Sequence, residues 1–224
     1  MLTSSSRVAT AATCSSSSPT VGDQAVDIRP LSIAGAFEIT PRQYRDSRGT
    51  FAEGFRIDRL AEAIGHELQV RQTNISVSTA GALRGIHYSD VPPSQAKYVT
   101  ATSGVFIDFV VDVRVGSPTY GQWDSVRLDT VDRRAVYVAE GLGHALACVE
   151  DGAAVYLCSR LFDPAREHAV NPLDPAIGLV LPEGFVPIVS DKDAAAPTFE
   201  AAADQGLLPT LEASLAYAAS LAGH

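Results

Sequence analysis

The chain has 224 residues, 46% of them hydrophobic and 19% charged, which is enough for one globular domain with a sizeable core and excludes disorder of the whole chain. A formal net charge of -9 with only 17 Lys plus Arg argues against a broad nucleic-acid surface, because neutralising phosphates needs clustered cations. No apolar run approaches the roughly 18 residues of a membrane-spanning helix, so membrane insertion is not expected.

Residues 1–25 form a segment rich in Ser, Thr and Ala that holds Arg7 and no acidic residue before Asp23. We interpret this segment as a disordered tail, while the same bias also occurs in organelle transit peptides. A single folded domain is expected over residues 26–224, because neither an internal repeat nor a linker long enough to divide it follows the tail.

The three cysteines, Cys14, Cys148 and Cys158, have no CxxC spacing, and two of them lie in apolar, strand-like runs. An odd number of cysteines in this setting predicts buried, reduced thiols rather than a disulfide framework. We therefore expect a cytoplasmic protein.

Short β-rich runs separated by turn-forming residues follow the tail, with few helical patterns among them. In chain order the expected strands are Phe37–Ile39, Leu68–Val77, Tyr98–Thr102, Val105–Val113, Ser125–Asp129, Ala135–Val138, His144–Cys148 and Ala154–Ser159. The spacing of apolar residues predicts short helices only at Asp58–His66 and Thr210–Leu221. Regularly spaced short strands with Gly, Pro and Asp between them are typical of an all-β sandwich or barrel.

The run Val105–Val113 combines continuous apolar residues with Asp108 and Asp112. It predicts a central strand whose two acids face a polar lumen or a turn. Ordinary solvation at the edge of a strand is the alternative interpretation.

The run Arg84–Pro93 is the most informative part of the sequence, since it holds Arg84 and His87 and is followed shortly by Lys97. Imidazole titrates near neutral pH, and the pair of prolines that closes the run would hold the adjacent backbone stiffly. His87 is therefore the strongest candidate for a general base. Lys97 or Arg84 could stabilise the anion that proton abstraction creates, and we expect the group at a strand-to-loop corner.

Polar residues at Gln72, Asn74 and His144 stand within apolar strand sequence. Burying them without hydrogen bonds would be costly in free energy. A cavity inside the sheet structure explains them better than a solid core.

With Gln-Thr-Asn at 72–74 and Gly-Leu-Gly-His at 141–144, the Arg84–Pro93 run resembles the dTDP-4-dehydrorhamnose 3,5-epimerase family, over roughly Ile33 to Leu208. The resemblance implies an all-β, jelly-roll-like (cupin-type) double-sheet barrel with a few short helices. It also implies epimerisation at C3, C5 or both of a dTDP-linked 4-keto-6-deoxyhexose, in dTDP-L-rhamnose or related deoxysugar biosynthesis. The ketone acidifies the neighbouring C–H bond, so the resemblance implies no cofactor.

The same resemblance implies catalytic roles for four residues. His87 with Asp193 removes the ring proton, while Lys97 stabilises the enolate. Tyr156 matches the family tyrosine that works on the opposite face of the sugar, and its phenol is a fair proton donor. Asp193 lies in a Ser-Asp-Lys-Asp run similar to the family's Ser-x-Lys-Asp signature, in which Asp191 is its competitor.

Substrate binding is what the resemblance implies for a further set of positions. Arg48 matches a diphosphate-binding arginine and Glu53 a residue near the base, although the Asp-Ser-Arg-Gly context of Arg48 alone reads as a turn. Phe162 stands where the family often has a second tyrosine, so the ring for base stacking remains and the hydroxyl is lost. The expected substrate-binding residues are Arg48, Glu53, Gln72, Asn74, Arg84, His144 and Phe162.

A metal site is an alternative raised by the barrel architecture, because many cupins hold a metal with two His one residue apart, a Glu and a distant His. Here position 89 is Ser and the next acid is Asp90, which leaves His87 and His144 without a carboxylate. Two imidazoles alone make a poor site for iron, manganese or nickel, so we expect no metal.

Two functional alternatives stay open. Enzymes similar to this chain in antibiotic deoxysugar pathways epimerise a single carbon, and Phe162 is the kind of pocket change that could have this effect. The other alternative is a catalytically silent barrel that binds a nucleotide-sugar or a protein partner, since fold does not imply activity. We also expect a homodimer, because Phe37–Ile39 could pair with a partner's sheet and cover an open edge.

Overall fold

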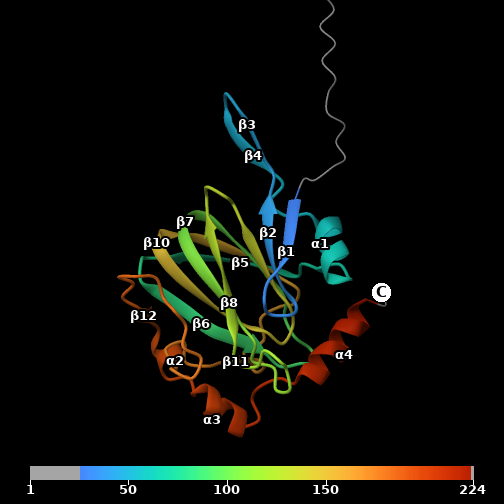
Figure 1. The fold of residues 1–224 in the computed structure, drawn as a ribbon, viewed down its shortest axis with the longest axis vertical. Helices are drawn as coiled ribbons and strands as arrows, with labels where there is room; N and C mark the ends of the chain where they lie inside the picture. Colours follow the sequence, from blue (N-terminus) through green and yellow to red (C-terminus); the bar gives the residue numbers. More distant parts are fainter. Residues whose placement is uncertain (1–25, 223–224) are drawn as a thin grey trace, which may run out of the picture.

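Figure 1 shows a computed structural model of the protein, which describes residues 26–222. The expected disordered tail and Cys14 lie outside the described residues. Ten strands form one hydrogen-bonded sheet, and two more form a separate hairpin. In this part of the chain, no helix has both the length and the apolar character needed to cross a membrane.

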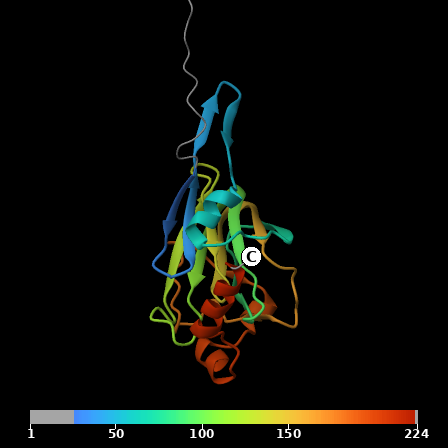
Figure 2. The same cartoon turned by 90° about the vertical axis from the view of Figure 1, so that its right-hand side faces the viewer.

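The large sheet folds over into two layers, because its two longest strands, β7 (Lys97–Val111) and β10 (Gly143–Cys158), run through both. The first part of β7 pairs with β9 (Ala135–Val138), and its second part pairs with β8 (Trp123–Asp129). In the same way, β10 pairs first with β6 (Ala82–Ser89) and then with β5 (Gln72–Ser78). The fold is therefore the expected jelly-roll-like double-sheet barrel, seen from two sides in Figures 1 and 2.

The bends of the two long strands explain why the sequence predicted each of them as two strands. Gly104 lies at the bend of β7 with a φ of +72°, and a Cβ placed there would lie 2.7 Å from the Cα of Gly152 in β10. The β7–β10 pairing shifts in register between Cys148 and Ala154. The glycine-containing turn signals thus mark bulged bends in continuous strands, where backbones approach too closely for side chains.

Phe37–Ile39 lies within β2 (Ala36–Pro41), which is hydrogen-bonded on both sides, to β1 (Val26–Pro30) and to β9. The expectation that this segment pairs with a partner's sheet was wrong, because the unpredicted strand β1 and strand β9 of the same chain occupy both of its edges. At the other end of the sheet, β11 (Glu167–Ala169) and β12 (Ile188–Val189) pair with β6.

A hairpin made of β3 (Gln43–Asp46) and β4 (Gly49–Ala52) was also not predicted. It extends away from the barrel in both views (Figures 1 and 2). We call residues 43–52 the arm. Its strands are only four residues long, which is too short for a clear alternating pattern.

Both expected helices are present, as α1 (Ile57–Ile64) and α4 (Leu211–Leu221). Two shorter helices, α2 (Asp191–Ala194) and α3 (Phe199–Asp204), were missed, because so few residues carry no helical period. Each begins at a hydroxyl N-cap that accepts a backbone hydrogen bond, Ser190 for α2 and Thr198 for α3. In Figure 1 α2, α3 and α4 lie along one end of the barrel.

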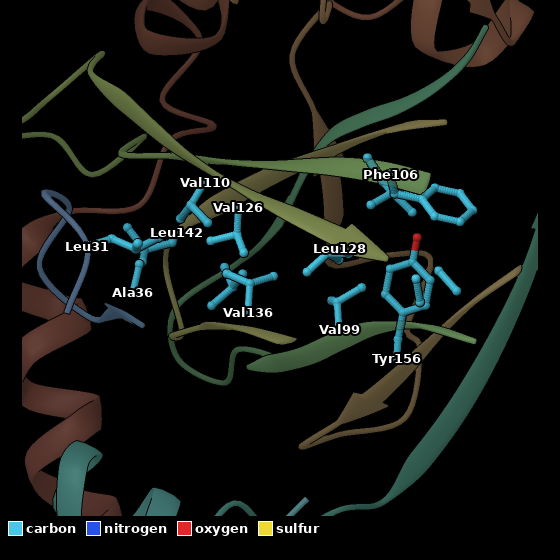
Figure 3. Packing of buried hydrophobic residues seen from close by; sticks show 14 of the residues in the cluster. Leu31, Ala36, Val99, Phe106, Val110, Val126, Leu128, Val136, Leu142 and Tyr156 are labelled. Atoms are coloured by element: carbon cyan, nitrogen blue, oxygen red, sulfur yellow. The ribbon is translucent and has the colours of Figure 1, made fainter. Parts of the chain in front are cut away.

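The core fills the space between the two layers (Figure 3). Val99, Val136 and Tyr156 come from the layer that contains β9 and β5, whereas Phe106, Val126 and Leu128 come from the layer that contains β8 and β6. These side chains form one buried cluster, so the two layers share a single interior.

The two acids of the Val105–Val113 run lie in different surroundings. Asp108 is fully buried and shares the alternation of Phe106 and Val110, so it points into the barrel interior. Asp112 lies after β7, where its Oδ2 accepts 2.6 Å hydrogen bonds from the hydroxyls of Ser117 and Thr119. Each of the two predicted environments, a lumen and a turn, therefore holds one of the acids.

Candidate active site

His87 and Asp193 form a hydrogen-bonded pair at one wall of the barrel. His87 lies within β6, not at the expected corner after a strand, and its Nε2 is 2.7 Å from Oδ1 of Asp193. Asp193 is brought there by α2, whose N-cap Ser190 fixes the first turn. The competing residue Asp191 is exposed at the start of the same helix, so the structure places Asp193 against His87.

The pairing settles how the His87 ring is oriented. Burial alone raises the pKa of Asp193, but hydrogen bonds from His87, the Gly85 backbone N–H and Ser190 outweigh it and leave this pKa below its usual value. Asp193 is therefore ionised at neutral pH and accepts a hydrogen bond from the Nε2–H group of His87. Nδ1 then carries the lone pair and is bonded to no residue that the structure describes. An imidazole held in this way is a ready general base.

Tyr156 and His144 extend the group across the barrel interior. His144 is the Cα partner of His87 in the β6–β10 ladder, and its Nδ1 lies 3.1 Å from Oδ1 of the buried Asp108. The Tyr156 ring packs edge-on against the His144 ring, with centroids 5.9 Å apart. Burial, together with the charge of Asp108, raises the pKa of Tyr156, so its phenol stays protonated and can act as a donor.

Lys97 and Arg84 are the two cations that the sequence predicted for this site. Lys97 begins β7, is almost fully buried, and forms no ion pair with a described residue. Its Cα partner in β10 is Cys158, two residues after Tyr156 and therefore on the same face of the strand. The guanidinium of Arg84 is fixed by Nε donating to Ser78 Oγ at 3.1 Å, and its charge lowers the pKa of Tyr156 against the larger effect of burial.

Gln72, Asn74 and Phe162 are brought together on the edge of β5. The side-chain amide of Gln72 donates to Asn74 Oδ1 at 2.7 Å and accepts from the backbone N–H of Phe162 at 2.9 Å. Asn74 is the Cα partner of Tyr156, so this polar row continues directly into the barrel. The Phe162 side chain is free to contact a ligand, because the residue is 54% exposed.

Arg48 and Glu53 do not join the other predicted residues within this chain. Arg48 occupies the turn of the arm, pairs with Asp46 at 2.6 Å, and has an 88% exposed side chain. Glu53 follows the arm and pairs with Arg56 at 3.1 Å. The arm that carries Arg48 extends away from the barrel (Figures 1 and 2), and Glu53 follows directly after it.

A cavity of about 890 Å³ opens beside the site, and the sequence reasoning missed nearly all of its lining. Phe162 is the one predicted site residue among those lining it, and Ser89, Glu140 and Ser159 lie on its barrel side. Tyr217 and Leu221 of α4 form another wall. Their four-residue spacing marked a helix face in the sequence, but nothing there linked that face to the Arg84–Pro93 run.

Two further findings bear on cofactors and thiols. Within residues 26–222, no group of three or more His, Cys, Asp or Glu side chains is arranged to hold a metal ion. Cys148 and Cys158 are buried free thiols, as expected, and burial raises the pKa of both. Both thiols are therefore protonated at neutral pH.

Comparison with known proteins places this geometry among sugar-nucleotide epimerases. The sequence model of the family described as dTDP-4-dehydrorhamnose 3,5-epimerase matches residues 20–201. The chain is 54% identical to a dTDP-4-dehydrorhamnose 3,5-epimerase of Mycolicibacterium smegmatis, over 81% of this chain and 90% of the relative. It is 53% identical to a dTDP-4-dehydrorhamnose 3-epimerase of Streptomyces niveus, over 82% of this chain and 88% of the relative.

Solved structures agree with the sequence relatives. An epimerase of Mycobacterium tuberculosis superposes with a TM-score of 0.85 at 47% identity, covering 87% of this chain and 99% of that chain. A 3'-monoepimerase of Streptomyces bikiniensis in complex with dTDP-quinovose also gives a TM-score of 0.85, at 46% identity, covering 88% of this chain and 100% of that chain. The relatives thus include enzymes that act on one carbon and enzymes that act on two.

Proposed function

Because the chain belongs to the dTDP-4-dehydrorhamnose 3,5-epimerase family, we propose that it inverts C3, C5 or both of a dTDP-linked 4-keto-6-deoxyhexose. The observation that carries this proposal is the His87–Asp193 pair facing the interior where Tyr156 is held protonated. Inversion at carbon requires a base on one face of the substrate and an acid on the other.

The first step is proton abstraction next to the ketone. Nδ1 of His87 takes the proton from C3 or C5, and the electron pair of the C–H bond moves into the ring to give an enolate at the C4 oxygen. The proton remains on the imidazolium, which the carboxylate of Asp193 stabilises. Asp193 thus positions the ring and pairs with the imidazolium without taking the proton itself.

Lys97 and Arg84 stabilise the negative charge of the enolate. Lys97 is buried without an ion-pair partner among the described residues, so its ammonium is available to an oxyanion. Arg84 is held by Ser78, and from there its charge lowers the pKa of Tyr156. Tyr156 then donates its proton to the opposite face of the same carbon, which inverts the configuration. The phenolate takes a proton back from solvent, and the His87 imidazolium releases the abstracted proton to solvent, which restores both groups.

The mechanism needs no added cofactor, since the ketone itself acidifies the C–H bond. We therefore expect turnover to survive exhaustive dialysis against EDTA. The measurement is the rate of conversion of dTDP-4-keto-6-deoxyglucose, followed by proton NMR, before and after chelation. Loss of turnover that a divalent metal restores would falsify the cofactor-free mechanism.

The number of inverted carbons is the part of the function that overall identity does not decide, because a 3-epimerase and a 3,5-epimerase are nearly equally similar to this chain. Phe162 is the observation that supports the single-carbon reaction, since its exposed ring lacks the hydroxyl that the family often has there. Ring coupling constants in the NMR spectrum of the product distinguish inversion at C3, at C5 and at both. A protein that binds dTDP and converts nothing would instead be a silent nucleotide-sugar-binding barrel.

The arm supports a homodimer as the active form. Arg48 and Glu53 are expected to bind the diphosphate and the base, yet Arg48 lies on the arm, which points away from its own barrel, and Glu53 follows directly after it. In a symmetric dimer, a projecting hairpin can deliver these residues to the partner's barrel. We expect light scattering at micromolar protein to give twice the chain mass of 23.6 kDa.

Mixing two inactive variants tests whether the arm acts on the partner. Arg48→Ala impairs the arm and His87→Asn impairs the barrel. If arms act in trans, a mixed dimer contains one site with an intact barrel and an intact arm, so mixing restores activity. A monomeric mass, or no restoration after subunit exchange, would count against this arrangement.

A further inference from the structure

The helix α4 lies beyond residue 201, where the family match ends, yet it is fastened to the barrel. The Val115 N–H donates to the Pro209 carbonyl at 2.8 Å, and the Val115 carbonyl accepts from the Leu211 N–H at 3.0 Å. Ser214 is 3% exposed and packs on Gly141, leaving no room for a Cβ there. Gly141 lies in the turn that leads into β10 and His144, so α4 is fixed relative to the site.

Tyr217 holds Arg160 at the wall of the 890 Å³ cavity. Arg160 Nε donates a 3.0 Å hydrogen bond to the Tyr217 hydroxyl, and the guanidinium carbon lies 5.9 Å from the centre of the ring. The Arg160 carbonyl accepts a 2.8 Å hydrogen bond from the side chain of Gln95. Both ends of Arg160 are therefore held, one by the barrel and the other by α4.

Arg160 also differs from the other arginine near Phe162 in its ion pairing. Arg166 lines the same cavity but pairs with Asp163 at 3.5 Å, whereas Arg160 forms no ion pair with a described carboxylate. A guanidinium has five N–H donors and keeps its charge at any physiological pH. With one donor spent on Tyr217, the others remain for an anion in the cavity.

The position of Arg160 in the chain connects it to the substrate-binding residues. It follows Cys158, the Cα partner of Lys97, and precedes Phe162, whose backbone N–H is fixed by Gln72. Arg160 thus lies, along the chain, between a residue opposite Lys97 and the ring expected to stack on the base, and it lines the same cavity as that ring. In a sugar nucleotide, the diphosphate likewise lies between the sugar and the base.

We propose that Arg160 binds the diphosphate of the substrate and that Tyr217 is its positioning residue. The identity of this anion rests on the function proposed above. Fork-shaped guanidinium donors match phosphate oxygens well, and the cavity wall fixes the fork before the ligand arrives. The helix α4 thereby becomes part of substrate recognition, although it contributes nothing to the proton transfers.

The test compares Arg160→Gln, Tyr217→Phe and the unmodified protein. Arg160→Gln should raise KM and the calorimetric Kd for dTDP by about 10- to 100-fold, as expected for losing charge-assisted hydrogen bonds. Tyr217→Phe keeps the ring and removes only the acceptor, so a rise of roughly 3- to 10-fold is expected. In both variants kcat should stay within about threefold of the original, because uniform binding is lost and the chemistry is untouched.

Arg166→Gln is the matched control, since it removes an arginine of the same cavity that Asp163 already neutralises. Its KM and Kd should stay within about twofold of the original. Equal losses in Arg166→Gln and Arg160→Gln, or unchanged dTDP affinity in Arg160→Gln, would overturn the assignment. An unmodified protein that binds no dTDP would overturn both this inference and the proposed function, whereas binding that Arg160→Gln retains overturns the inference alone.

Discussion

Replacing His87 with asparagine should lower solvent deuterium uptake at C3 and C5 of the substrate by at least about 10³-fold, within the range that general-base catalysis supplies. Asparagine can still hydrogen-bond to Asp193 but has no basic lone pair near neutral pH. Lys97 and Tyr156 do not replace it, since the ammonium has no lone pair and the phenol is held protonated. The measurement is position-resolved NMR of substrate incubated in deuterated water.

A second His–Asp pair provides the control for this variant. His168 Nε2 lies 2.7 Å from Asp90 Oδ1, the same separation as in the His87 pair, but its ring packs against the buried Tyr88 rather than facing Tyr156. His168→Asn should therefore leave exchange within about threefold of the unmodified protein. If His87→Asn exchanges within about tenfold of it, a barrier change of only roughly 1.4 kcal/mol, the base has been wrongly assigned.

Replacing Tyr156 with phenylalanine should separate exchange from inversion. The change removes one hydroxyl and leaves His87 free to take a proton, exchange it with solvent and return it to the same face. Deuterium should then accumulate in substrate of unchanged configuration, while the inverted product falls by about 10²-fold or more. NMR reports both quantities from one sample.

Tyr88→Phe is the control for loss of a buried phenol. Tyr88 follows His87 in β6 but packs in the cluster on the other side of that strand, and its hydroxyl has no hydrogen-bond partner among the described residues. Removing that hydroxyl should change neither exchange nor inversion. Inversion by Tyr156→Phe at the original rate would make Tyr156 a packing residue and require another donor.

The barrel could be predicted because its signals are local. Strands such as Ala135–Val138 were found at their observed bounds, since a short apolar run between turn formers needs little context. The sequence could not show that each long strand continues through its bend. Gly104 and Gly152 resemble turn residues, and only the pairing of β7 with β10 shows that the strands bend there without ending. The same lack of context concealed β1 as the neighbour of Phe37–Ile39.

The site residues likewise divide into those that local sequence patterns predict and those that depend on tertiary contacts. Residues carried on regular strands, such as His87, His144 and Tyr156, meet in the interior because strand register places them there. Only the family resemblance points to Asp193. The four-residue helix α2 contains both Asp191 and Asp193 and buries only Asp193, but it is too short to have a periodic signature in the sequence. The cavity wall formed by Arg160 and Tyr217 depends on how α4 docks, which is a tertiary fact that no local pattern encodes.

The most direct test of the two-sided proton-transfer mechanism is the fate of the ring hydrogens during a single conversion. The unmodified protein is incubated with dTDP-4-keto-6-deoxyglucose in deuterated water, and the product is analysed by NMR at C3 and C5. Every inverted carbon should carry deuterium, since its new hydrogen comes from Tyr156 after exchange with solvent. An inverted carbon that keeps its original hydrogen would contradict the account, because that hydrogen would have been moved within the substrate rather than removed by His87 and replaced from the other face.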